Sequence, residues 1–224
     1  MFIVLAKLLV DYFAVFYIYK LLFKKNNDSL NLNKLHFKFL LGTIAGLLLP
    51  LIVTCVFYLY NFNHQLEVNF EINFLTLFVN QFGISIGEEL VFRALIFQSL
   101  LNLNKSFFKS SIISSLIFCI FHLNQIDFNM NLFHVIINLT ACFSASLLLC
   151  YLYYKFKSIW YPIGWHFGWN ICVFLLFPGF NLFRFNNIVF ESKSNFELVL
   201  MFLLIATTVI IYSIFYITTN RLKN

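Results

Sequence analysis

Three short stretches of the sequence contain the residue types that acid–base chemistry needs. "EELVFR" begins at residue 88, "FCIFH" at 118 and "HFGWN" at 166. Their polar members are Glu88, Glu89, Arg93, His122, His166 and Asn170. A carboxylate and an imidazole can orient and deprotonate water, while an imidazole and a carboxamide can donate hydrogen bonds to a developing oxyanion. Such a set of groups suits a hydrolytic reaction.

The two adjacent glutamates point in different directions if residues 88 to 93 form a helix. Glu89 and Arg93 are four residues apart and share a face, whereas Glu88 is rotated about 100° from Glu89. Arg93 can therefore neutralise Glu89, which leaves Glu88 without a partner in its own helix. A carboxylate removed from water is a stronger base. Glu88 is accordingly the candidate general base.

The other two stretches each place two side chains on one helical face. Phe118 and His122 are four residues apart, so an aromatic ring can pack beside the imidazole. His166 and Asn170 have the same spacing and point two polar groups at one place. Each pair alone is weak support for catalysis, because a membrane histidine more often bonds to a neighbouring carbonyl or hydroxyl group.

The composition is that of an integral membrane protein. Of the 224 residues 61% are hydrophobic and 11% are charged, and the mean hydropathy is +0.85. A helix of about 20 apolar residues crosses a hydrocarbon core about 30 Å thick. The sequence therefore predicts an all-α fold, a polytopic transmembrane bundle of about seven helices with the active site between the three that carry the motifs. The expected spans are 2–23, 39–60, 72–101, 107–123, 132–154, 159–177 and 198–218.

The distribution of charge predicts how the chain lies in the membrane. If the spans alternate, most lysines fall on one side, which the positive-inside rule makes cytoplasmic. This gives an outside N-terminus and a cytoplasmic C-terminus in the plasma membrane. The net charge of +6 is then explained by the orientation of the chain in the membrane. The expected partner is therefore the lipid bilayer, and no nucleic acid is expected. Span 2–23 lacks a basic start and a small-residue cleavage site, so we expect it to be retained.

The chain reads as a single membrane domain over residues 1–224. It has no internal repeat, Gly-rich phosphate loop or low-complexity linker. All five cysteines fall inside expected spans without a CxxC spacing, so they are predicted to be buried thiols, neither disulfides nor metal ligands. They are Cys55, Cys119, Cys142, Cys150 and Cys172.

With these motifs in this order, the sequence resembles the CPBP family of intramembrane proteases. That family includes type II CAAX prenyl endopeptidases and proteins for bacteriocin processing and self-immunity. Its pattern is EExxxR, FxxxH and HxxxN or HxxxD on three transmembrane helices, matched here within residues 72–177, the expected protease core. One departure is Ala94, where the family commonly has a glycine after the arginine.

The resemblance implies a role for each motif residue. Glu88 and His122 would activate water, and His166 and Asn170 would bind the oxyanion. Glu89, Arg93 and Phe118 would support them structurally. Family members have been described both as metalloproteases and as metal-free glutamate enzymes. We favour no metal cofactor. A zinc ion remains the alternative, with Glu88, His122 and His166 as its ligands.

Two classes of function fit these features. The first is an endopeptidase that cleaves a peptide or protein substrate, such as a lipid-modified protein or a bacteriocin precursor, at the cytoplasmic side. The second is a non-catalytic self-immunity protein that binds a peptide in the same cavity. An ion transporter is disfavoured because no repeated halves are visible. One geometric difficulty remains, since counting along the spans places Glu88 near mid-bilayer, His122 near the outer end and His166 nearer the inner end.

Overall fold

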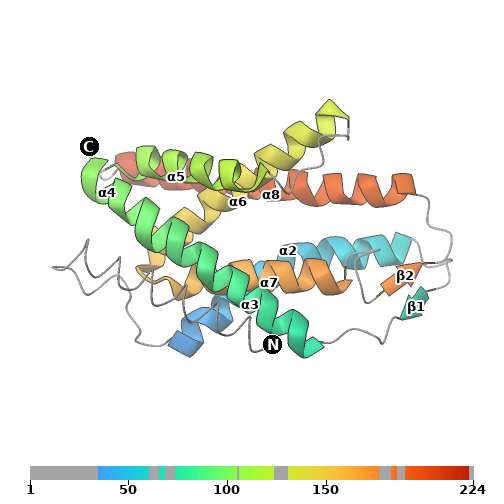
Figure 1. Cartoon of the computed structure of the whole chain (residues 1–224). Helices are drawn as coiled ribbons and strands as arrows, with labels where there is room; N and C mark the ends of the chain where they lie inside the picture. Colours follow the sequence, from blue (N-terminus) through green and yellow to red (C-terminus); the bar gives the residue numbers. More distant parts are fainter. Residues whose placement is uncertain are drawn as a thin grey trace.

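A computed structural model of the chain describes residues 35–60, 66–68, 74–104, 106–123, 131–176, 183–185 and 190–221. Nearly all of these residues are helical (Figure 1). The elements are α2 (Leu35–Tyr60), β1 (Leu66–Val68), α3 (Phe74–Glu89), the π-helix η1 (Leu90–Phe97), α4 (Gln98–Asn104), α5 (Phe107–Phe121), α6 (Leu132–Phe156), α7 (Trp160–Leu176), β2 (Phe183–Phe185) and α8 (Phe190–Arg221).

The predicted all-α bundle is confirmed. Elements α3, η1 and α4 follow one another without a break, so they form one rod over the expected span 72–101. Each of the other expected spans from 39–60 onward also coincides with a helix, whereas span 2–23 lies outside the described residues. One small feature was not predicted: β1 and β2 pair antiparallel, with Leu66 opposite Phe185.

The outer surface of the bundle is apolar. Three of the described helices contain stretches long and apolar enough to cross a membrane, namely Phe37–Val56, Leu132–Phe156 and Glu197–Thr219. Large side chains such as Leu59 and Leu132 are each 74% exposed. A soluble protein rarely exposes apolar surface on this scale. The surface therefore suits a lipid environment.

Helices α2 and α7 run parallel and touch through their main chains. A Cβ atom added to Gly42 or Gly46 would collide with the backbone of α7, and one added to Gly164 or Gly168 would collide with the backbone of α2. Small residues allow this approach in membrane bundles, where helices gain little from leaving lipid. This contact fixes α7, the helix that carries the HFGWN motif.

Aromatic side chains pack the α3–η1–α4 rod against α7. In Figure 1, α2 and α7 lie side by side, α5, α6 and α8 form the other part of the bundle, and the α3–η1–α4 rod runs diagonally in front of them. Phe78 and Phe82 of α3 pack edge-on against Phe167 of α7, with ring centroids 4.8 and 5.7 Å apart. The α3 part of the rod is thus packed against α7.

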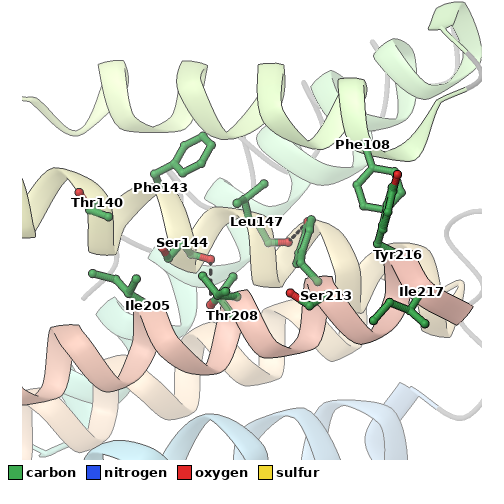
Figure 2. A pocket seen from close by; sticks show the side chains of 12 residues that line it. Phe108, Thr140, Phe143, Ser144, Leu147, Ile205, Thr208, Ser213, Tyr216 and Ile217 are labelled. Atoms are coloured by element: carbon green, nitrogen blue, oxygen red, sulfur yellow. Dashed lines mark hydrogen bonds between the residues drawn. The ribbon is translucent and has the colours of Figure 1, made fainter.

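A hollow of about 630 Å³ lies between α5, α6 and α8 (Figure 2). Two of its polar side chains already have partners within the chain. Thr208 donates to the Ser144 carbonyl at 3.4 Å, and the Tyr212 hydroxyl donates to the Leu147 carbonyl at 2.7 Å (Figure 2). Its lining includes none of the polar motif residues, so the hollow is separate from them.

The glycine contacts generate the first prediction. Gly46→Ala should lower the free energy of unfolding by about 1–3 kcal/mol, because the new methyl group forces α2 away from α7. Gly87→Ala is the matched control: a Cβ there meets no atom within 4 Å. Since alanine is the better helix former, the control should lose no stability. Unfolding of both variants by titration with sodium dodecyl sulfate in mixed micelles measures the difference. Equal midpoints would contradict the close contact.

Candidate active site

The carboxylate of Glu88 meets the imidazole of His122. Glu88 lies near the end of α3, and His122 caps the C-terminus of α5. The His122 Nε2 is 3.3 Å from the Glu88 Oε2. The His122 Nδ1 is 2.9 Å from the Phe118 carbonyl, which can only accept, so Nδ1 carries a hydrogen. In the neutral ring, Nε2 is then an acceptor. The Glu88 carboxylate is also an acceptor, so His122 and Glu88 need a shared proton or a hydrogen from a water molecule between them.

The hairpin of α4 and α5 explains why these two residues meet. Glu88 lies 16 residues before the end of α4 at Asn104, and His122 lies 15 residues after the start of α5 at Phe107. At about 1.5 Å per residue, these separations are about 24 and 23 Å. The two arms are antiparallel and equal in length, so their reactive ends lie side by side. The mismatch in depth expected between Glu88 and His122 is therefore absent.

His166 stands between the two glutamates. Its Nδ1 is 2.9 Å from the Glu89 Oε1, and its Nε2 is 3.8 Å from the Glu88 Oε2. Because a carboxylate oxygen accepts, the Nδ1 donates to Glu89, which fixes the ring and turns Nε2 toward Glu88. Helical spacing predicted only the Arg93 partner of Glu89, because 77 residues separate Glu89 from His166.

Glu89 and Arg93 form the ion pair that their spacing predicts. The Arg93 Nε is 3.1 Å from the Glu89 Oε2, and both side chains are fully buried. Arg93 also donates from Nη2 to the Ser146 hydroxyl at 3.2 Å and lies 4.7 Å from the centre of the Phe118 ring. Ser146, on α6, belongs to none of the three motifs. The only sequence signal for it was a small polar residue inside an apolar span.

The π-helical segment η1 carries Arg93. At its end, the Gln98 backbone N–H bonds to the Arg93 carbonyl five residues back, the spacing of a π-helix. Isolated π turns are frequent at functional sites, because the wider turn redirects side chains. Here the segment follows Glu89 directly and presents Arg93 to α5 and α6.

Phe118 and Asn170 complete the set of predicted residues. The Phe118 ring stacks on the His122 imidazole, with ring centroids 4.1 Å apart. Asn170 is partly buried one turn beyond His166, and its carboxamide has no hydrogen bond within the described chain. It is therefore available to a bound molecule. The structure brings Glu88, His122 and His166 together directly, with Asn170 adjacent on α7.

Among the residues that the structure describes, no group of three or more His, Cys, Asp or Glu side chains is arranged to hold a metal ion. All five cysteines are free thiols, and Cys119, Cys150 and Cys172 are buried as expected. Cys142 is partly buried. Cys55 is exposed on α2, contrary to the expectation of burial.

Comparison with known proteins bears on the segment that contains this site. The family model for type II CAAX prenyl endopeptidase Rce1-like proteins matches residues 69–172. This segment belongs to the Rce1-like family. No curated protein and no solved structure matches the chain. The match confirms the resemblance seen in the motifs, all of which lie inside the Rce1-like segment.

The match to the Rce1-like family bears on the broad function. At the level of the family, it supports a CAAX-type intramembrane protease, which implies a peptide or protein substrate. The apolar helices agree with an integral membrane protein.

The buried ion pair of the Rce1-like segment generates the second prediction. Arg93→Met should lower the free energy of unfolding by about 3–5 kcal/mol, because it leaves Glu89 as a buried carboxylate without its arginine. The double variant Glu89→Gln/Arg93→Met removes both charges and should recover part of this loss. Lys109→Met, at an exposed position of α5, is the control. Unfolding in mixed micelles tests the series, and a double variant less stable than Arg93→Met would contradict the pairing.

Proposed function

We propose that the chain is a glutamate-dependent intramembrane endopeptidase, in which Glu88 and His122 activate the water that attacks a peptide bond. The observation that carries this proposal is that one carboxylate oxygen, the Glu88 Oε2, lies 3.3 Å from the His122 Nε2 and 3.8 Å from the His166 Nε2. The Glu88 side chain is 17% exposed, so water can reach part of it, although the Oε2 atom itself is buried. Its neighbour Glu89 is fully buried and already paired.

The reaction follows from these contacts. Glu88 or the His122 Nε2 takes a proton from water, and the resulting hydroxide bonds to the scissile carbonyl carbon. The electron pair of the carbonyl moves to its oxygen, which becomes the oxyanion. When this intermediate collapses, the carbon–nitrogen bond breaks, and the proton held by the Glu88–His122 pair passes to the departing amine. No atom outside the substrate, the water and the pair is consumed.

His166 and Asn170 stabilise the oxyanion in this proposal. The Asn170 carboxamide has an N–H to donate, as does the His166 Nε2 when the ring is doubly protonated. Since the His166 Nδ1 already donates to Glu89, only the imidazolium form leaves a hydrogen on Nε2. Fixed donors act strongly here because the site lies in an apolar, low-dielectric surrounding.

The orientation in the membrane belongs to the same proposal. Lys38, Lys109, Lys155 and Lys157 lie at the end of the bundle where α2, α5 and α7 begin and α6 ends. The positive-inside rule makes this end cytoplasmic, which gives a multi-pass protein with a cytoplasmic C-terminus. His166 is six residues from the start of α7, or about 9 Å from that end of the helix. This supports cleavage from the cytoplasmic side.

Cleavage of a peptide is the direct test. Purified protein in liposomes is given a quenched-fluorophore peptide with a farnesylated CAAX end. Glu88→Gln and His122→Ala should each lower kcat/KM at least about 100-fold, the usual contribution of acid–base groups, while unfolding as the wild type does. Glu197→Gln and His134→Ala change the same residue types outside the site and should keep activity. Unchanged cleavage by Glu88→Gln would refute the mechanism.

We further propose that catalysis needs no metal ion. Water activation by Glu88 and His122 is complete without a Lewis acid, because both proton acceptors are in place. Protein treated with 1,10-phenanthroline and shown by mass spectrometry to be free of zinc should cleave the peptide at the untreated rate. Loss of activity on chelation, with recovery on adding zinc, would establish instead a zinc site formed by Glu88, His122 and His166.

A further inference from the structure

The hollow between α5, α6 and α8 is a groove that opens to the surface of the bundle. Its lining on α8 runs from Ile205 to Ile217, and these twelve steps of helix extend about 18 Å. In Figure 2, Thr140 and Ile205 lie at one end of the groove, and Tyr216 and Ile217 lie at the other. Tyr216 and Ile217 are each more than half exposed. A molecule in the surrounding lipid can therefore enter the groove from the side.

The wall of the groove suits a hydrocarbon chain. Half of its lining residues have purely hydrocarbon side chains, Phe143 and Val209 among them. The hydroxyl groups of Thr140, Thr208 and Tyr212 each donate to a main-chain carbonyl 2.7–2.8 Å away. These three groups are thus already used within the chain. The volume of about 630 Å³ lies in the usual range of small-molecule sites, about 300–1,000 Å³.

The groove begins at the end of the bundle that carries the lysines and extends about as deep as one bilayer leaflet. Phe108, which lines it, is the second residue of α5. Ile217 is four residues before the end of α8 at Arg221. The hydrocarbon core is about 30 Å thick, so one leaflet takes up about 15 Å of it. A groove of about 18 Å can therefore hold one acyl chain of the leaflet on that side.

Lysine side chains give this end of the groove a positive charge. Lys109 is exposed on α5 and directly follows Phe108. At the end of α6, the Lys157 Nζ lies 4.2 Å from the centre of the Tyr154 ring, which packs 4.8 Å from that of Phe107 on α5. The carboxylates of the described residues lie elsewhere, in β1, in the α3 site and in the first eight residues of α8. Lysines at a membrane surface attract anionic lipids.

We propose that the groove binds an anionic phospholipid of the leaflet on the lysine side. One acyl chain lies in the groove between α6 and α8, and the phosphate group is bound by Lys109 and Lys157. Long lysine side chains extend their ammonium groups along an apolar surface to the interface, which allows both to reach a head group there. The site is separate from Glu88 and does not depend on the protease function. Because the lipid binds the folded bundle, it also stabilises the fold.

Photo-crosslinking tests the binding site. The full chain is placed in phosphatidylcholine vesicles with a phosphatidylglycerol probe that carries a diazirine in its acyl chain, and labelled peptides are mapped by mass spectrometry. The label should concentrate on the groove residues of α6 and α8. Excess unlabelled phosphatidylglycerol should remove it, and excess phosphatidylcholine should not. Lys109→Gln and Lys157→Gln should each raise the half-saturating probe concentration about fivefold. Lys38→Gln removes a charge at the same end but on α2, so it should change little.

Filling the groove provides an independent test. Ser213→Phe adds a ring at an exposed lining position, so it should lower labelling of the groove at least about tenfold. Thr218→Phe adds the same ring at an exposed position of α8 outside the lining and should leave labelling unchanged. Phosphatidylglycerol should raise the unfolding midpoint of the wild type and of Thr218→Phe, but not that of Ser213→Phe.

Three results would overturn the inference. The first is a label spread evenly over the exposed faces of α2, α6 and α8. The second is equal displacement by phosphatidylcholine, which would show that the groove does not select an anionic head group. The third is displacement by a farnesylated peptide but not by phosphatidylglycerol, which would assign the groove to the substrate.

Discussion

The ion pair between Glu89 and Arg93 is the interaction on which the rest of the site depends. Both side chains are fully buried, so each must offset the cost of leaving water. The pair alone does not use all of their bonding capacity. Glu89 also accepts from His166 on α7, and Arg93 also reaches Ser146 on α6 and the Phe118 ring on α5. One buried pair thus specifies how three other helices are placed around the α3–η1–α4 rod.

The adjacent carboxylates acquire different properties from this arrangement. Glu89 is fully enclosed and held by two partners, which suits it to orient His166. Glu88 points about 100° away around the helix and keeps a 17% exposed side chain between two imidazoles. Buried ion pairs contribute little net stability, but they can select one arrangement among several. Here the arrangement that they select leaves the Glu88 side chain partly exposed between two imidazoles.

The sequence predicted local relationships well. The apolar spans from 39–60 onward, the Glu89–Arg93 pair and the stacking of Phe118 on His122 all follow from the sequence pattern, and each is present. Relationships between helices were less accessible. The bond from Glu89 to His166 spans 77 residues and that from Arg93 to Ser146 spans 53, so no periodic pattern relates these partners. The π-helical turn at Arg93 was also not predicted, because "LVFRALIF" has the composition of an ordinary α-helix.

Helix packing sets the positions of the site residues, and the polar hydrogen bonds then orient their side chains. In lipid, helices gain little by burying apolar side chains against each other, so close contact has to supply the attraction. Glycines let α2 and α7 touch through their backbones, and Phe78 and Phe82 brace α7 against α3. His166 therefore approaches the glutamates on a helix that is already fixed from two sides. Its hydrogen bond to Glu89 only has to orient a ring, and a single such bond is sufficient for that.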